Sequence, residues 1–235
     1  MTRPCIVRDL GRMSYAEALS IQEGIANERK QGEGTDHLLF VEHPHVVTIG
    51  RNGRESNVLA SPDLLRTKGI SVYESDRGGD VTYHGPGQIV AYPIMDLRNW
   101  QRDVGKFVRG IEQALIDTLE EFEIQAFRIP GLAGVWTEAG LLSRKAESSK
   151  IAAIGVHLSR WVSTHGWALN VTTDLSFFDF IVPCGLTKPV TSMERMGVQA
   201  DPEEVKRAMA RHFGREFGFE IETQASTPEL TGALR

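Results

Sequence analysis

The spacing of apolar residues and the capping signals around them predict four helices. The strongest pattern runs over residues 103–122, where Val, Phe, Ile and Leu recur every three or four positions. We expect that stripe to pack in the core and not to form a cofactor site. Ser14 followed three positions later by Glu17 is a capping box, which predicts the start of an earlier helix. The expected helices cover about residues 14–29, 61–69, 103–122 and 201–217.

Runs of apolar and β-branched residues predict a larger number of strands. Beyond an early apolar strand that contains Cys5, they cover residues 37–43, 45–51, 70–76, 88–96, 133–138, 150–159 and 165–171. The polar stretch 143–149 is expected to be a loop, and about 222–235 a frayed tail. Because the chain has no internal repeat and no change of composition that would mark a linker, residues 1–235 are predicted to form a single α/β (α+β) domain.

Composition and charge exclude several classes of function. The chain of 235 residues is 41% hydrophobic and 24% charged, which is typical of a globular protein with a sizeable core. A net charge of −5 argues against nucleic acid as a partner. The N-terminus lacks the apolar run of a signal peptide, and no apolar stretch approaches the roughly 20 residues that cross a bilayer. We therefore expect a cytoplasmic protein without a membrane segment.

The stretch RGGDVTYHGPGQ, residues 77–88, contains four glycines and a proline between two predicted strands. Such a backbone either turns sharply or approaches a ligand closely. Neither the P-loop nor the dinucleotide-binding pattern fits, because a strand and not a helix follows Gly87. Arg77 and His84 could hold a carbonyl or a negative charge. Glycine content alone leaves a ligand-binding loop and a plain solvent loop both open.

Only two cysteines are present, Cys5 and Cys184, so there is no disulfide framework and no zinc spacing. Cys5 is expected to pack in its strand. Cys184 stands between a proline and a glycine, where a turn could present a nucleophilic thiol, although an inert packed cysteine is also possible. A thiol with a pKa near 8.5 needs a nearby base or positive charge to react at pH 7. The candidates for that base are His84, His157, His165 and Lys150.

Four motifs in order resemble the octanoyltransferase family, whose members attach octanoate to lipoyl domains. They are HPHVVTIGR (43–51), RGGDVTYHGPGQIVAYPI (77–94), KIAAIGVHLSRWVSTHGWALNV (150–171) and FIVPCG (180–185). Together they cover most of the chain from about 37 to 195. The combination of TYHGPGQ with a distant PCG is specific. The family is similar in fold to lipoate and biotin protein ligases, which implies a central mixed β-sheet flanked by helices.

The resemblance also implies the site. Cys184 matches the family nucleophile, which receives octanoate as a thioester, and Lys150 matches its catalytic partner. The matching acyl-binding residues are Arg77, Gly78, Gly79, Asp80, Val81, Thr82, Tyr83, His84, Ala153, Ile154, Gly155, Gly166, Trp167 and Ala168. We expect the glycines among them to leave room for an eight-carbon chain. Because amide formation from a thioester is downhill, neither ATP, another cofactor nor a metal is expected.

The implied partners are octanoyl-acyl carrier protein as donor and, as acceptors, lipoyl domains of 2-oxoacid dehydrogenase complexes and the glycine-cleavage H protein. Docking of these acidic partners would need a local basic patch, for which Arg51, Arg54, Arg98, Arg102 and Lys106 are candidates. Two other readings remain open. One is an ATP-dependent lipoate or biotin ligase on the same fold, and the other is a module that binds an acyl chain or a lipoyl domain without catalysis.

Overall fold

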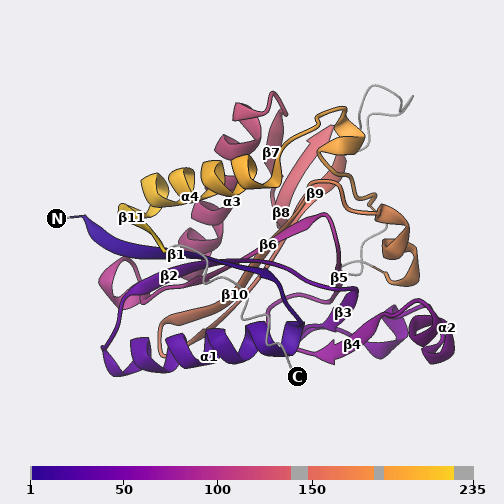
Figure 1. The fold of residues 1–235 in the computed structure, drawn as a ribbon, viewed down its shortest axis with the longest axis horizontal. Coiled ribbons are helices and arrows are strands. Elements are labelled where there is room, and N and C mark those ends of the chain that lie inside the picture. The colour runs from indigo at the N-terminus through magenta and orange to yellow at the C-terminus, as the bar shows by residue number, and fades with distance from the viewer. Residues whose placement is uncertain (1, 139–147, 183–187, 225–235) are drawn as a thin grey trace, which may run out of the picture.

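The computed structural model describes residues 2–138, 148–182 and 188–224. At its centre lies a mixed sheet of eight strands (Figure 1). From edge to edge these are β11 (Phe219–Gln224), β1 (Arg3–Arg12), β2 (Asp36–Glu42), β6 (Gln88–Ile94), β10 (Val162–Asn170), β9 (Ser148–Ser159), β8 (Leu132–Glu138) and β7 (Ala126–Ile129). β1 runs parallel to both of its neighbours, and every other neighbouring pair is antiparallel.

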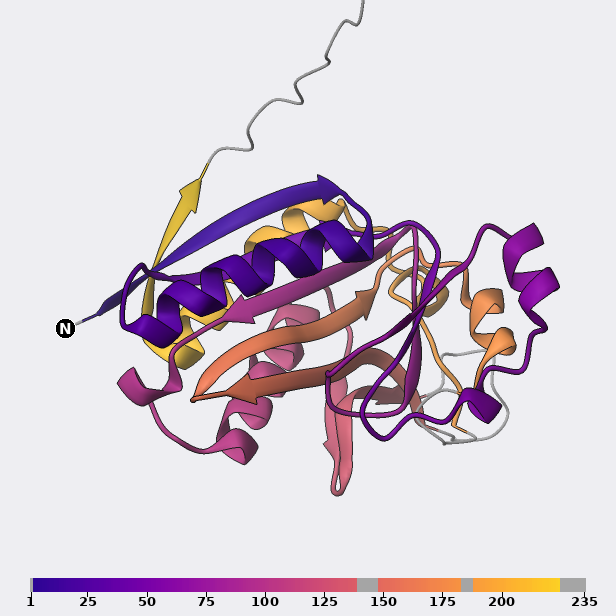
Figure 2. The same cartoon turned by 90° about the horizontal axis from the view of Figure 1, so that it is seen from below.

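Helices cover both faces of this sheet. On one face α3 (Val104–Glu121) and α4 (Pro202–Phe217) bury Phe107, Phe213 and Phe217 against alternate residues of the strands. On the other face α1 (Tyr15–Gln31) packs Ala18 and Ala26 against β2, β6 and β10. Figure 2 shows α1 lying along the sheet. The predicted sheet flanked by helices is confirmed.

A second, smaller sheet lies beside the first, next to the short helix α2 (Pro62–Thr67) (Figure 1). Its strands are β4 (Ser71–Glu74), β3 (Val46–Ile49) and β5 (Val81–His84), in that order. β5 occupies the middle of the glycine-rich stretch 77–88, so the prediction of a continuous loop there was wrong. Residues 81–84 become a strand because their backbone pairs antiparallel with β3 and they are buried along their whole length.

The local signals for helix ends act as expected. The Ser14 hydroxyl accepts from the backbone N–H of Glu17, and the Glu17 carboxylate accepts from the N–H of Ser14. α1 ends at Gly32, whose φ of 85° is in the left-handed region that favours glycine. Asp201 caps α4 at its start. All four predicted helices are therefore confirmed, with the 61–69 helix shortened to α2.

The structure corrects the expected tail and loop. Residues 222–224 belong to β11 and not to a frayed tail, because β11 pairs with β1 and buries Phe219 at its start. Residues 225–235 lie outside the described residues. Ser148 and Ser149, expected in the 143–149 loop, begin β9, and residues 143–147 are not described. β7 was not predicted; its four residues form a short edge strand.

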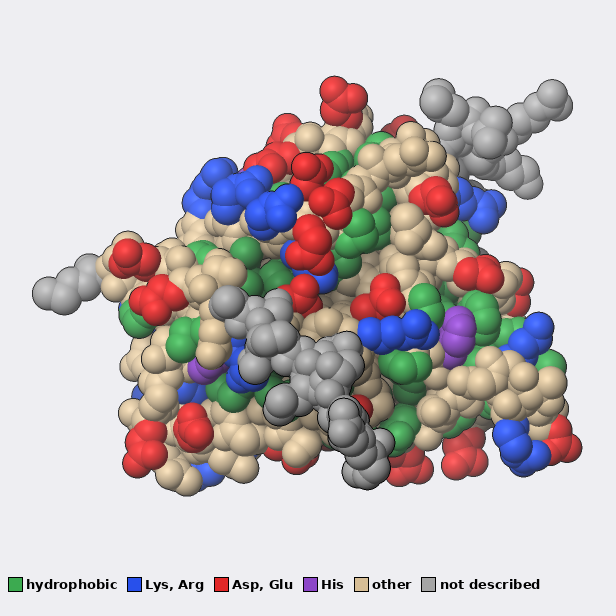
Figure 3. Space-filling model, viewed as in Figure 1, with side chains coloured by type: hydrophobic (Ala, Val, Ile, Leu, Met, Phe, Trp, Pro, Cys, Tyr) green, Lys and Arg blue, Asp and Glu red, His purple; other side chains and the backbone are tan. Residues whose placement is uncertain are grey.

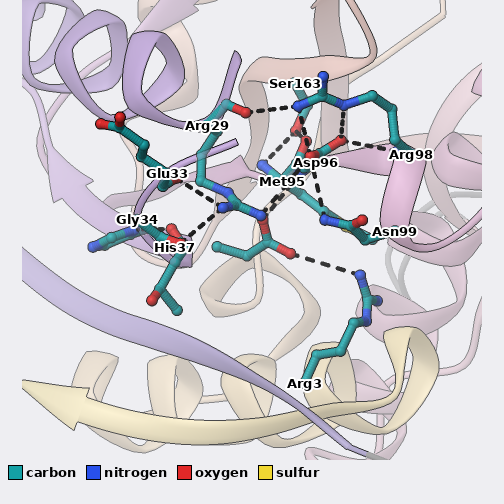
Figure 4. Close-up of polar contacts among 12 residues, drawn as sticks. Arg3, Arg29, Glu33, Gly34, His37, Met95, Asp96, Arg98, Asn99 and Ser163 are labelled. Atoms are coloured by element: carbon teal, nitrogen blue, oxygen red, sulfur yellow. Dashed lines mark hydrogen bonds and ion pairs between the residues drawn. The ribbon is translucent and has the colours of Figure 1, made fainter. Parts of the chain in front are cut away.

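A buried ion-pair network ties α1 to the strands (Figure 4). Arg29 donates to the Asp36 carboxylate at 2.9 Å and to two carbonyl groups that follow α1. Asp36 also accepts from the backbone N–H of Asp96, at 2.9 Å. Arg98 donates to both carboxylate oxygens of Asp96 and to the carbonyl of Arg29. Arg98, a candidate for the docking patch, is thus held inside this network.

Charges of both signs are interspersed on the face that displays α4 (Figure 3). Arg211 pairs with Glu121 at 2.7 Å, and Lys206 with Asp9 at 2.6 Å and Glu203 at 2.7 Å. Among the described residues, the basic side chains on this face are therefore mixed with acidic ones. Among the helices of the described residues, none is long and apolar enough to cross a membrane.

Candidate active site

A pocket lies where the glycine-rich stretch meets β6, β9 and β10. It is a narrow pocket with a cavity volume of about 40 Å³ and an open mouth. Its lining residues are Tyr15, Arg77, Gly78, Gly79, Thr82, His84, Val90, Tyr92, Ala153, Ile154, Gly155, His165, Gly166, Trp167 and Ala168. Eleven of the fourteen residues predicted to bind an acyl chain are thus brought together from three separate stretches.

Asp80, Val81 and Tyr83, the other three, do not line this pocket. Successive side chains of a strand point to opposite faces. In β5, Thr82 and His84 therefore face the pocket, while Val81 and Tyr83 pack in the core of the smaller sheet. The Asp80 carboxylate accepts a hydrogen bond from the side chain of Asn57, at 2.6 Å. Alternation along β5 therefore explains why Val81 and Tyr83 do not line the pocket whereas Thr82 and His84 do.

Arg77 fastens the glycine-rich stretch to the smaller sheet. Its guanidinium donates to the hydroxyl of Thr48 at 2.9 Å and to the Thr48 carbonyl at 2.6 Å, and Arg77 is only 6% exposed. On the other side, the N–H of Gly78 donates to the carbonyl of Val156 in β9, at 3.0 Å. These bonds hold the two sheets together at the wall of the pocket.

The pocket glycines are required by close approach of backbones. A Cβ added at Gly155 would lie 2.6 Å from the carbonyl oxygen of Gly78, and one at Gly166 would collide with the carbonyl oxygen of Ala91. Gly79 has a φ of 93°, which disfavours any side chain. We expected these glycines to leave room for a ligand. Their first effect is instead to let the strands and the loop meet.

His165 adopts a left-handed backbone, with a φ of 58°, in the middle of β10. Its N–H donates to the side-chain oxygen of Gln22 at 2.8 Å, and its Nε2 lies 2.6 Å from the Asp76 carboxylate. Trp167, two residues on, packs on the α4 side, whereas the His165 ring contacts Tyr92 on the α1 side. The unusual backbone thus accompanies a side chain that lines the pocket. Among the candidate bases, His157 also contacts Asp76, at 3.3 Å.

Burial keeps the pocket histidines neutral. It lowers the pKa of His84 to about 3, against a partly compensating hydrogen bond between Nδ1 and Gln88, 2.7 Å away. Burial also lowers the pKa of His165, although the Asp76 carboxylate opposes that change. Both imidazoles are therefore uncharged at pH 7, which suits an apolar ligand better than an anionic one.

Tyr15, Val90 and Tyr92 were missed as lining residues. Val90 and Tyr92 are alternate residues of β6, so strand alternation could have indicated both once one was placed. The Tyr92 hydroxyl lies 2.7 Å from Nε2 of His43, so it is hydrogen-bonded within the chain. Tyr15 comes from α1, more than sixty residues before the glycine-rich stretch. The sequence contains no local signal for that contact.

Lys150 lies at a β-bulge in β9. Trp136 pairs with Lys150 and Val135 with Ala152, so one extra residue, Ile151, stands in β9. Bulges of this kind redirect side chains and are frequent beside active sites. Here Lys150 lines a small cavity together with Ala153, and both Ala153 and Ala168 are shared with the larger pocket. Lys150 therefore lines a cavity that adjoins the pocket.

The segment after Cys184 returns to the same place. The N–H of Lys150 donates to the carbonyl of Pro189, and the N–H of Thr191 donates to the carbonyl of Lys150, each at 2.9 Å. On the preceding side, the N–H of Val182 donates to the carbonyl of Asn57, at 2.7 Å. Cys184 itself lies outside the described residues. Cys5 is fully buried, as expected, and burial raises the pKa of its thiol.

The described residues contain no group of three His, Cys, Asp or Glu side chains that could hold a metal ion. The site as described therefore consists of an apolar pocket with neutral histidines and a lysine in an adjoining cavity. Such a combination fits the handling of a small apolar group next to a proton-transfer residue.

Comparison with known proteins identifies the family. The model of the lipoyl protein ligase A/B catalytic domain matches residues 14–214. The chain belongs to this family. An octanoyltransferase of Solibacter usitatus is 59% identical over 224 residues, covering 95% of this chain and 98% of that one. An octanoyltransferase of Acidobacterium capsulatum is 47% identical over 224 residues, covering 90% and 89%. The chain is an acyltransferase, and the predicted family resemblance is confirmed.

Solved structures agree on the fold of the lipoyl protein ligase A/B family. A bi-partite lipoate protein ligase of Thermoplasma acidophilum aligns with a TM-score of 0.70 at 17% identity, covering 95% of this chain and 88% of that one. A lipoate-protein ligase A bound with ATP aligns with a TM-score of 0.65 at 17% identity, covering 95% and 90%. A biotin protein ligase of Aquifex aeolicus gives 0.52 at 13% identity, covering 90% and 69%. The predicted lipoate- and biotin-ligase-like fold is confirmed.

Proposed function

We propose that this enzyme transfers an octanoyl group from octanoyl-acyl carrier protein to a lysine of a lipoyl domain, through a thioester on Cys184. The octanoyltransferase names of relatives up to 59% identical support the acyl group. The observation that supports the route most directly is the position of Lys150. It lines a small cavity that adjoins the apolar pocket, and its backbone is bonded to Pro189 and Thr191, which follow Cys184 in the chain.

In the first half-reaction the neutral amine of Lys150 accepts the thiol proton of Cys184. The thiolate attacks the carbonyl carbon of the donor thioester, and a tetrahedral intermediate forms. Its collapse breaks the bond to the carrier sulfur, which leaves as a thiolate and takes the proton back from Lys150. The octanoyl group is then a thioester on Cys184, and Lys150 is again neutral.

In the second half-reaction the amine of the acceptor lysine attacks the Cys184 thioester. Lys150 accepts a proton from the nitrogen that has attacked, and the Cys184 sulfur leaves and is reprotonated by Lys150. One thioester is consumed and one amide forms, so the exchange balances without ATP. The octanoyl chain would occupy the pocket during both half-reactions. Its carbonyl end would lie beside Thr82 and Ala168, next to Lys150, and its apolar end beside Tyr15 and Tyr92.

The test supplies an unmodified lipoyl domain with either octanoyl-acyl carrier protein alone or free octanoate and ATP. Intact mass of the lipoyl domain reads out the product. We expect octanoylation with the carrier protein and none with octanoate and ATP. Product only in the ATP arm would identify a ligase, whose fold this chain shares. Reversible binding of the lipoyl domain without product in either arm would identify a binding module.

A further inference from the structure

Trp136 is the large side chain in contact with Lys150. The two residues are paired across β8 and β9, and Trp136 is 1% exposed. The Nζ of Lys150 lies 4.7 Å from the centroid of the Trp136 ring. That distance is within the range of a cation–π interaction, in which the electron-rich face of an aromatic ring attracts a positive charge. Tryptophan has the strongest such face among the side chains.

The ring and the lysine stem are both held in place. The indole N–H of Trp136 donates to the carbonyl of Leu132 at 3.3 Å, which restricts rotation of the ring. A Cβ at Gly134 would lie 2.7 Å from the carbonyl oxygen of Ala152 and 3.3 Å from Cε of Lys150. Gly134 therefore lets β8 approach β9 closely and also leaves space for the Lys150 side chain, whose Nζ lies over the Trp136 ring.

The same ring also contacts the chain beyond Cys184. The ammonium nitrogen of Lys188 lies 5.9 Å from the centroid of Trp136. Lys188 is exposed and directly precedes Pro189, whose carbonyl is bonded to Lys150. Trp136 therefore has the amino groups of both Lys150 and Lys188 within 6 Å of its ring centroid.

We propose that Trp136 is a positioning residue that holds the amino group of Lys150 in place for proton transfer in each half-reaction. The inference rests on the proposed function, because it assumes that Lys150 accepts the Cys184 proton. The ring face lies 4.7 Å from Nζ and restrains that nitrogen without taking the proton itself. Loss of the Trp136 ring should therefore lower the rate of the chemical step and leave binding of the octanoyl donor unchanged.

The experiment compares Trp136→Phe with Trp136→Leu. Both variants lose the bond to Leu132 and both are smaller than tryptophan, but only phenylalanine keeps an aromatic face. We expect kcat for octanoyl transfer to be about ten-fold lower in Trp136→Leu than in Trp136→Phe, with KM for the octanoyl donor unchanged. Trp100, which packs on Phe107 and Phe217, supplies the control. Trp100→Phe and Trp100→Leu should have equal kcat values.

Equal kcat values for the two Trp136 variants, or a difference confined to KM, would overturn the proposal. Absence of transfer by the wild-type enzyme would instead contradict the proposed function itself. A second measurement needs no Trp136 variant to fold. In wild type with ¹³C-dimethylated lysines, the Lys150 signal, assigned by its loss in Lys150→Arg, should be shifted upfield by the indole ring. A Lys150 signal at the position of exposed lysines would also overturn the inference.

Discussion

At the residue scale, the pocket is defined by which groups stay uncharged. His84 is buried and its pKa is held at about 3, so it acts as a neutral hydrogen-bonding group beside Gln88. His165 is likewise neutral because burial lowers its pKa. The motif TYHG predicted that His84 contributes to the site, but its neutrality depends on burial by β6 and β10. No spacing in the sequence reports that burial.

The buried histidines predict a loss of stability in acid. The unfolded chain binds a proton at His84 near its ordinary pKa of 6.5, whereas the folded chain binds it only near 3. The free energy of unfolding should therefore fall as pH drops below 6.5, by about 2 kcal/mol at pH 5 from this residue alone. Urea denaturation at pH 7 and pH 5 measures the change.

A variant isolates the contribution of His84. In His84→Gln the difference in unfolding free energy between pH 7 and pH 5 should shrink by that amount. His157→Gln is the control. His157 is partly exposed and burial lowers its pKa less than that of His84, so this variant should change the pH dependence less. An unchanged pH dependence in His84→Gln would show that His84 is not the buried neutral group described here.

Strand alternation decides which residues of the glycine-rich motif face the pocket, and their binding of an acyl chain stays a prediction. Arg77, Thr82 and His84 line the pocket, but Val81 and Tyr83 from the same motif point away. The sequence pattern predicted a loop over 77–88. A predicted strand over 81–84 would have placed Thr82 and His84 on one face and Val81 and Tyr83 on the other. The role of Cys184 stays a prediction, because it lies outside the described residues.

At the element scale, the frame of the site depends on strands that pair over long distances in the chain. β11 pairs with β1, so that Phe219 lies opposite Arg3. The apolar pattern marks a strand only when its partner is known, and the short edge strands β5, β7 and β11 have weak patterns of their own. The long helix α3 could be predicted because its periodicity is local. The pairing of strands could not be predicted, because the periodicity of apolar residues contains no information on which strands pair or in which register.

The network around Asp36 makes a prediction for the junction of α1 and β2. Asp36→Asn removes the nearer of the two carboxylates beside the buried guanidinium of Arg29 and leaves Asp96 at 3.9 Å, and loss of one partner of a buried pair costs about 3 kcal/mol. Urea denaturation at pH 7 measures it. Asp63→Asn is the matched control, because Asp63 is 87% exposed in its pair with Arg66 and should cost less than about 0.5 kcal/mol.

Activity separates this framework role from a role in the site. Since the network lies at the ends of α1 and β6, kcat per folded molecule should be unchanged in Asp36→Asn. A variant as stable as wild type would contradict the network's structural role. A folded variant with lost activity would show that the network acts on the pocket.

At the scale of the whole molecule, the site lies where the two sheets meet. The smaller sheet supplies Thr82 and His84, and the large sheet supplies Lys150, Ala153 and Ala168. Bonds from Arg77 and Gly78 close the joint between them. The resemblance of four motifs predicted this fold correctly, whereas the pattern of elements alone predicted only an α/β protein. Two of these motifs, 77–94 and 150–171, lie far apart in the sequence and together line most of the pocket.

The central claim is that octanoate is held on Cys184 with Lys150 as the base. The most direct test is the intact mass of the enzyme after brief incubation with octanoyl-acyl carrier protein. Wild type should gain an octanoyl adduct that hydroxylamine removes, and Cys184→Ser should gain none. Arginine in Lys150→Arg is always protonated and cannot accept the Cys184 proton, so adduct formation should slow by about 10²–10⁴-fold. Transfer to a lipoyl domain by Cys184→Ser, or an adduct formed at the wild-type rate by Lys150→Arg, would contradict the account.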